Sequence, residues 1–191
     1  RAHIISFLHR KYKFKKQPIG IDIIKNKNIK KNITFIRTDA NKYLKKNKRF
    51  DLIIIKQTVH FFNKKKITFL LEKIKKSLNP RGKLLILSLK IKNNRIPCFK
   101  KMKLKLNESL KKDKKLIDFI KKNLPNYKLS YFKFKVSITK KRYLRMIKDR
   151  YISCLLKLSN QDIKNGISEI NLKYSRKIQF IDTLLCISFR K

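Results

Sequence analysis

Apolar positions along the first half of the chain form short runs separated by polar turns, a pattern typical of strands that alternate with helices. Apolar residues recur at helical spacing over residues 2–12, which predicts an amphipathic helix. Isoleucine-rich runs predict strands over residues 18–24 and 33–38. The continuous run FDLIII at residues 50–55 is typical of a parallel strand that is buried on both faces.

A further helix and strand follow this buried run. Residues 64–78 carry one apolar stripe, which predicts an amphipathic helix. The polar turn NPRG at residues 79–82 ends that helix, and residues 84–89 form another apolar strand. Strand and helix therefore alternate through the first 90 residues, which indicates βαβ units and a parallel sheet.

The second half of the chain is less regular. Residues 91–105 are predicted to be a basic connection, and Ser159 with Asp162 forms a capping-box pattern. No internal repeat or long linker divides the chain, so we expect a single domain over residues 1–191. The predicted helices cover residues 107–123, 140–158 and 162–174. The predicted strands cover residues 127–138 and 178–189, and the first of these is a candidate antiparallel strand.

The composition excludes several classes of protein. Hydrophobic residues make up 42% of the 191 residues, which is too apolar for a disordered polycation. No apolar run approaches the roughly 20 residues of a membrane span, and no signal-peptide pattern is present, so we expect a cytoplasmic protein. The three cysteines lie far apart, which excludes a disulfide framework and a CxxC metal pair.

The charge points first toward nucleic acid, because 54 Lys and Arg against 11 Asp and Glu give a formal net charge of +43. The chain, however, holds only 3 glycines and two alanines, whereas average usage would supply about 13 glycines. Lys, Asn, Ile, Phe and Tyr replace them, and all of these residues have AT-rich codons. A codon bias therefore explains much of the charge, and a nucleic-acid partner is open but not favoured.

Two acidic residues stand at predicted strand ends, where doubly wound sheets bind their ligands. Asp22 ends the strand IGID, and its carboxylate suits the two hydroxyls of a ribose, with Gly20 leaving room for a close approach. Asp39 ends the next strand and suits an adenine amino group, with the small Ala40 beside it. Either acid also suits a helix cap or a turn, so both roles stay open.

The third strand end, KQTVHFF at residues 56–62, presents several reactive groups within seven residues. Gln57 and Thr58 offer an amide and a hydroxyl, and Phe61 offers an aromatic ring. The imidazole of His60 has an ordinary pKa that suits proton transfer near neutral pH. No cluster of His, Cys and carboxylate residues predicts a metal site.

Four motifs in this order and spacing resemble the class I S-adenosylmethionine-dependent methyltransferases, in the small-molecule branch called type 11. They are IGID at 19–22, TDA at 38–40, FDLI at 50–53 followed by residues 57–62, and residues 71–86 around the NPRG turn. The resemblance implies an α/β Rossmann-like fold, with a mostly parallel, doubly wound sheet and an antiparallel C-terminal strand. It divides the domain into a cofactor-binding half, 1–90, and a C-terminal half, 91–191, with a helical substrate-side insertion at about 140–175.

The resemblance also implies methyl transfer from S-adenosylmethionine to a small-molecule acceptor. Arg150 and Tyr151 lie on a predicted helix where either could face the acceptor by analogy, although a solvated Arg and a Tyr at the edge of the core are the favoured alternative. The implied cofactor-binding residues are Gly20, Asp22, Ile23, Asp39, Ala40 and Gln57; the implied acceptor residues are Thr58, Phe61, Arg150 and Tyr151; and His60 is the catalytic candidate.

Two departures from the family pattern stand out. No glycine-rich loop precedes the opening helix, so we expect an N-terminally truncated fold with a gap between the strands that contain Asp22 and Phe50. Arg81 occupies the first glycine position of the family's Pro-Gly-Gly turn, and a positive φ there would cost roughly 1 kcal/mol. An RNA methyltransferase on the same fold and an inactive, truncated domain are the alternatives.

Overall fold

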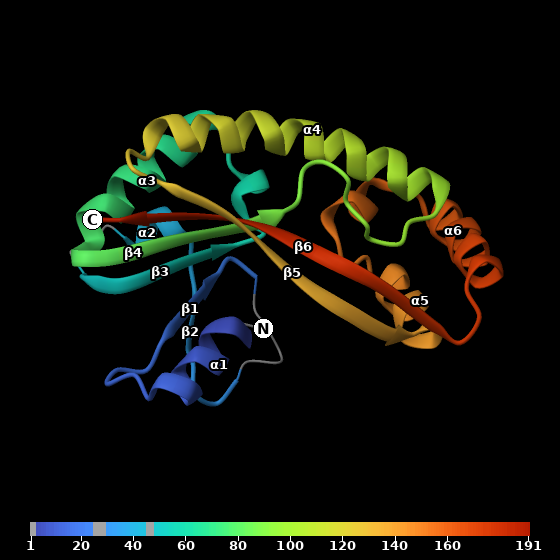
Figure 1. Ribbon diagram of the computed structural model, residues 1–191, viewed down its shortest axis with the longest axis horizontal. Coiled ribbons are helices and arrows are strands. Elements are labelled where there is room, and N and C mark those ends of the chain that lie inside the picture. Colours follow the sequence, from blue (N-terminus) through green and yellow to red (C-terminus); the bar gives the residue numbers. More distant parts are fainter. Residues whose placement is uncertain (1–2, 25–29, 45–47) are drawn as a thin grey trace.

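The computed structural model describes residues 3–24, 30–44 and 48–191, and the strands within them form two sheets. The first sheet pairs β1 (Ile19–Asp22) with β2 (Thr34–Arg37) in parallel. The second has the order β3-β4-β6-β5 and consists of β3 (Phe50–Lys56), β4 (Leu78–Leu89), β6 (Lys177–Arg190) and β5 (Lys128–Thr139). Figure 1 shows the small sheet below the larger one.

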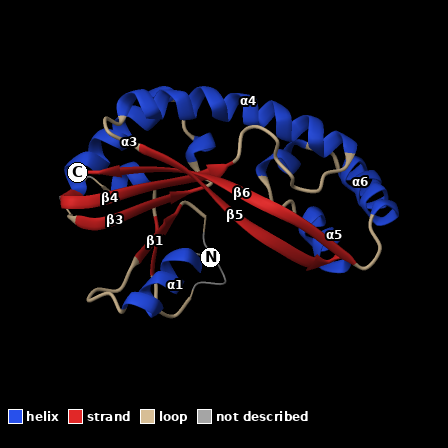
Figure 2. Cartoon of the chain, in the orientation of Figure 1, coloured by secondary structure: helices blue, strands red, loops and turns tan. Residues whose placement is uncertain are grey.

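Helices occupy much of the remaining chain, as Figure 2 shows. The α-helices are α1 (His3–Tyr12), α2 (Ala40–Tyr43), α3 (Lys64–Ser77), α4 (Lys100–Asn123), α5 (Lys140–Lys148) and α6 (Asn160–Lys173). Two short 3-10 helices are described, η1 (Val59–Phe61) and η2 (Ser153–Lys157).

Strand directions confirm the predicted α/β fold class. β3 runs parallel to β4, and β6 pairs antiparallel with both β4 and β5. In the larger sheet β6 alone therefore runs against the other strands, so the antiparallel C-terminal strand is confirmed. No pairing joins β1 to β3 within the described residues, so the expected gap between these two strands is confirmed as well.

One face of the larger sheet is buried under α3 and α4. Leu84 and Ile86 of β4 and Ile187 of β6 have no exposed surface, and they belong to one apolar cluster with residues of both helices. Full burial of such a side chain stabilises the fold by about 1.5–3 kcal/mol. This cluster fixes β4 between its parallel and its antiparallel neighbour.

A second apolar cluster lies where the first half of α4 meets α5, η2 and α6. Gly166 of α6 packs directly under the ring of Phe99, and a Cβ atom at this position would lie 2.5 Å from that ring. Figure 1 shows α4 running from α3 over to α6, so this one helix joins both clusters.

The predicted turn at residues 79–82 is the irregular first part of β4. Asn79 donates to Asp51 Oδ1 at 2.8 Å and so ties this segment to β3. Arg81 has a φ of 64°, as the glycine pattern of the family suggested. A Cβ at Gly82 would lie 2.8 Å from the carbonyl oxygen of Asn79 and 3.0 Å from that of Phe50, so only glycine fits there.

Two helix boundaries were predicted wrongly. α4 begins at Lys100 rather than at residue 107, because Met102 and Leu106 are buried in the second cluster. α5 ends at Lys148 rather than at 158, because Arg150 adopts a φ of 50° and turns the chain. The segment from Arg150 to Cys154 is therefore not part of α5, whereas the capping box of Ser159 with Asp162 is confirmed at α6.

The guanidinium of Arg150 holds the corner between α5 and α6. It donates to the carbonyl oxygen of Leu155, to that of Leu158 at 2.6 Å and to Asn160 Oδ1 at 2.9 Å. These bonds tie the turn after α5 to η2 and to the start of α6.

A membrane-spanning helix and a metal site are two features that the sequence does not predict, and the structure addresses both only over the described residues. Among the described helices, none is long and apolar enough to cross a membrane. Over the same residues, no three or more His, Cys, Asp and Glu side chains group so that they could hold a metal ion.

Arg81→Gly should raise the free energy of unfolding by about 1 kcal/mol, because glycine adopts a positive φ without side-chain strain. Urea denaturation at neutral pH measures the change. Lys83→Gly, at an exposed position of the same strand, is the control and should lower stability by about 0.5–1 kcal/mol. An equal decrease in the free energy of unfolding of both variants would contradict backbone strain at Arg81.

Arg150→Lys should lower the free energy of unfolding by about 2 kcal/mol, because an ammonium group cannot reach three acceptors as a guanidinium fork does. Arg145→Lys, at an exposed position of α5, carries the same change without those partners and should leave stability within about 0.5 kcal/mol of the parent protein. Thermal and urea denaturation test the pair. Equal stability of the two variants would remove the structural role of Arg150.

Candidate functional site

The carboxyl ends of β1 and β2 each carry an aspartate. Asp22 Oδ1 accepts from the backbone N–H of Ile24 at 3.1 Å and so closes a turn. Asp39 Oδ1 accepts from the N–H groups of Asn41 and Lys42 at 2.8 and 3.2 Å, which makes Asp39 the N-cap of α2. Within the described residues, Oδ2 of each aspartate has no partner. Both aspartates therefore keep one acceptor oxygen for a ligand.

Apolar surface lies beside these carboxylates. Ile23 directly follows Asp22 and is 64% exposed. Ala40 is half-buried at the start of α2 and packs against the main apolar cluster. Gly20 lies within β1, opposite Phe35 of β2. The pair of strand ends thus combines two carboxylate oxygens with an exposed aliphatic side chain, the chemistry that a nucleoside requires.

The carboxyl end of β3 is strained. Gln57 has a φ of 51°, which costs a residue other than glycine about 1–2 kcal/mol. Its N–H donates to the carbonyl oxygen of Leu87 at 2.7 Å, and its Oε1 accepts from Lys56 Nζ at 3.1 Å. Thr58, which follows, is exposed, and Phe61 projects from η1 with most of its ring exposed. Backbone strain of this kind clusters at functional sites.

His60 lies in η1 behind this strained residue. Its Nε2 atom is buried without a hydrogen-bond partner in the described structure. Burial lowers the pKa of His60 below its usual value of 6.5, and the carboxylate of Asp113 on α4 opposes this shift. Burial in turn raises the pKa of Asp113, and His60 lowers it. The sequence did not identify Asp113, because it comes from a helix far along the chain.

Most of the expected site residues stand at the carboxyl ends of three strands, two in the small sheet and one in the larger sheet. Gly20 and Asp22 with Ile23 belong to β1 and its turn, and Asp39 with Ala40 follows β2. Gln57, Thr58, His60 and Phe61 all follow β3. In doubly wound sheets ligands bind outside these ends, so this arrangement is the candidate active site.

Arg150 and Tyr151 lie elsewhere. Arg150 binds the carbonyl groups of the α5–α6 corner, and Tyr151 packs against the second apolar cluster. The hydroxyl groups of Tyr151 and Tyr143 are 3.0 Å apart, and burial raises the pKa of both phenols. The acceptor role of Arg150 and Tyr151 stays a prediction.

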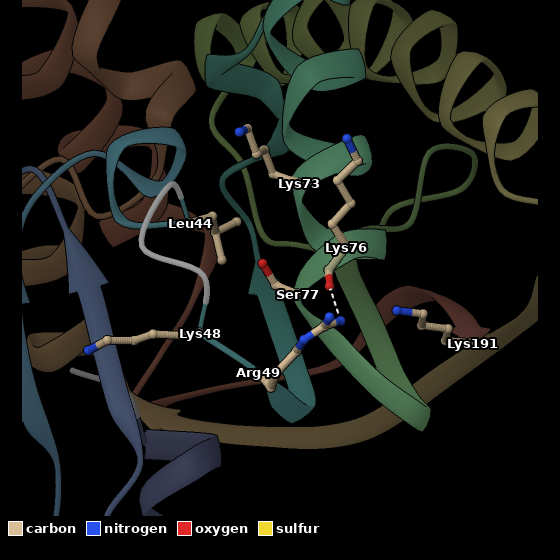
Figure 3. A pocket seen from close by; sticks show the side chains of 7 residues that line it. All are labelled: Leu44, Lys48, Arg49, Lys73, Lys76, Ser77 and Lys191. Atoms are coloured by element: carbon tan, nitrogen blue, oxygen red, sulfur yellow. Dashed lines mark hydrogen bonds between the residues drawn. The ribbon is translucent and has the colours of Figure 1, made fainter.

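A hollow of about 380 Å³ lies at the opposite, amino end of β3, and Figure 3 shows its lining. Arg49 donates to the carbonyl oxygen of Lys76 at 2.5 Å, and Lys191 donates to that of Leu78 at 2.8 Å. These cations bind the carboxyl end of α3, where the helix dipole favours positive charge. The ammonium group of Lys48 points away from those of Lys73 and Lys76 in Figure 3, so the lysines do not converge on one point.

Comparison with protein families gives one match for part of the chain. Residues 7–86 match the type 11 methyltransferase family model, which is described as a methyltransferase domain. The matched segment contains the strand ends that carry Asp22, Asp39 and Gln57. Comparison with curated proteins gives no match.

Solved structures share the fold at low sequence identity. A SAM-dependent methyltransferase from Archaeoglobus fulgidus is 16% identical and has a TM-score of 0.52, with 98% of this chain and 80% of that chain covered. The plantazolicin methyltransferase BpumL, solved with a triazolic desmethylPZN analog and SAH, is 13% identical with a TM-score of 0.50, covering 99% and 72%. Residues 7–86 are thus similar to the type 11 methyltransferase family, and the chain shares the fold of a SAM-dependent methyltransferase.

Proposed function

We propose that this chain transfers a methyl group from S-adenosylmethionine to a small-molecule acceptor at the carboxyl ends of β1, β2 and β3. The observation that carries the proposal is the pair of aspartates at adjacent strand ends. Asp22 and Asp39 each have one carboxylate oxygen without a partner among the described residues. The plantazolicin methyltransferase solved with a desmethylPZN analog and SAH supports a small acceptor.

The residues at β1 and β2 fit the nucleoside part of the cofactor. Oδ2 of Asp22 is placed to accept from ribose hydroxyls, and Oδ2 of Asp39 from the adenine amino group. The exposed side chain of Ile23 offers apolar contact to a ring. When bound, S-adenosylmethionine would supply a methyl group on its sulfonium, and an acceptor that attacks this carbon in line would release S-adenosylhomocysteine as the leaving group.

The residues after β3 fit the acceptor. The Thr58 hydroxyl and the Phe61 ring are exposed at the end of the strand and orient the acceptor there. Orientation of two reactants is the main contribution that a protein makes to such a displacement. Because burial keeps His60 neutral near pH 7, its imidazole is the candidate base for the proton that an acceptor hydroxyl or amine releases.

Isothermal titration with S-adenosylhomocysteine tests the cofactor site. We expect Asp22→Asn to weaken binding by about 10- to 100-fold, because hydrogen bonds to a carboxylate are worth about 1.5–3 kcal/mol. Asp149→Asn removes the same charge at an exposed position beyond α5 and should leave binding unchanged. No heat with the parent protein at millimolar ligand would overturn the proposal, as would equal weakening in both variants.

An NMR titration of the imidazole signals tests the state of His60. We expect a pKa below 6.5, and Asp113→Asn should lower it further by removing the charge that favours imidazolium. Asp118→Asn, on the exposed face of α4, is the control and should leave the His60 pKa unchanged.

The same shift predicts a dependence of stability on pH. The unfolded chain binds the His60 proton more readily than the folded chain does. The His60 contribution to the free energy of unfolding is therefore lost as the pH falls below about 6.5 toward the folded pKa. His60→Gln should remove this part of the pH dependence, and an unchanged slope between pH 7 and pH 5 in urea denaturation would contradict it.

A further inference from the structure

The outer strand of the larger sheet exposes an unusual number of aromatic side chains. β5 pairs with β6 along one edge, and within the described structure its other edge has no strand partner. Its first eight residues, 128–135, are all exposed. Phe132 is 64% and Phe134 38% exposed, and their ring centroids lie 6.3 Å apart on one face of the strand. Tyr131 is exposed on the other face.

Codon bias explains how many phenylalanines and tyrosines the chain contains, but not where they are exposed. Among the described residues Phe99 and Tyr143 are buried in the second cluster, and exposed rings also occur on α1, η1 and α3, but on β5 three exposed rings stand within four consecutive residues. On β5, Lys128 lies on the same face as Phe132 and Phe134, whereas Lys133 and Lys135 lie on the face of Tyr131, and the strand contains no acidic residue. We call Phe132, Phe134 and these three lysines the β5 platform.

The charge of the chain decides which partner suits the β5 platform. A second copy paired edge to edge would bring together two chains of formal net charge +43. Lysines on an edge strand are also a known means of preventing such pairing. A partner must therefore be negatively charged and offer flat apolar groups to the rings. Single-stranded nucleic acid has both properties, because every base has a π-face and every linkage a phosphate.

The register of the strands places the β5 platform close to the candidate active site. Phe132 lies opposite Leu184 of β6, which lies opposite Leu89 at the carboxyl end of β4. Two strand spacings separate Phe132 from that end, a distance of about 10 Å. A polymer held on β5 would thus pass near the carboxyl end of β4, beside which β3 leads into Gln57 and η1.

We propose that the β5 platform binds single-stranded nucleic acid. Bases stack on Phe132 and Phe134, Lys128 binds phosphate on the same face, and Lys133 and Lys135 add positive charge on the other face of the strand. This surface goes beyond the proposed function, since it does not require that the methyl acceptor be a nucleotide.

Fluorescence anisotropy with a labelled oligouridylate of about twelve nucleotides tests the stacking, since single-strand sites span about 4–16 nucleotides. Phe132→Ala with Phe134→Ala should weaken binding by about 30-fold or more and leave the dependence on salt unchanged, because stacking releases no counterions. The control is Phe7→Ala with Phe69→Ala, which removes two rings of comparable exposure, 55% and 39%, on α1 and α3. Equal affinities of the two double variants would overturn the proposal.

Three further measurements separate the β5 platform from general attraction by a basic protein. Lys128→Gln should reduce the slope of log affinity against log salt by about 0.7, whereas the paired phenylalanine variant should not change it. The parent protein should prefer the single strand to a duplex of the same length, because paired bases cannot stack on the rings. Equal affinity for both forms would overturn the proposal.

Light scattering should show that the parent protein is a monomer. A dimer that is lost in the Phe132→Ala, Phe134→Ala variant would overturn the proposal and assign β5 to a second copy of the chain.

Discussion

The packing of α3 and α4 on one face of the four-stranded sheet is the interaction on which the other features depend. It removes Leu84, Ile86 and Ile187 from water and so fixes β4 between β3 and β6. With β4 fixed, the carboxyl end of β3 lies beside that of β4, and the N–H of Gln57 reaches the carbonyl oxygen of Leu87. Because these helices cover one face only, Leu85 and Leu87 on the other face stay partly exposed.

This rigid layer explains how the chain tolerates its strained residues. Arg81 and Gln57 both have positive φ values, one before and one after a buried stretch of strand. Each conformation costs about 1–3 kcal/mol and persists only where the surrounding structure determines it. At Arg81 the determinant is the close approach of Gly82 to the Phe50 carbonyl, and at Gln57 it is the hydrogen bond to β4. The strain at Gln57 turns the chain outward and leads it into η1, which carries His60.

The sequence predicted those elements whose signal is local. The apolar runs at residues 50–55 and 84–89 became β3 and β4, because a run of isoleucine and leucine has few alternatives to a buried strand. Asp22 and Asp39 were found because strand ends are readable from the same runs. The start of α4 and the end of α5 were missed, since both depend on distant packing, of Met102 in one case and of Arg150 in the other. The electrostatic interaction of His60 with Asp113 also depends on distant packing, so no local sequence pattern predicts it.

Because the composition is biased, the positions of the glycines and acidic residues are more informative than their numbers. In a chain with 3 glycines, Gly82 and Gly166 occupy sites where a Cβ would meet a carbonyl oxygen or the ring of Phe99. Among 11 acidic residues, Asp22 and Asp39 end adjacent strands, and Asp51 fixes the start of β4 through Asn79. A bias toward AT-rich codons would replace these residues if nothing held them, so the positions of Gly82, Gly166 and Asp51 mark where the fold sets the requirement. The same reasoning applies to abundant residues: the number of phenylalanines reflects the bias, but two exposed rings 6.3 Å apart on an edge strand reflect the fold.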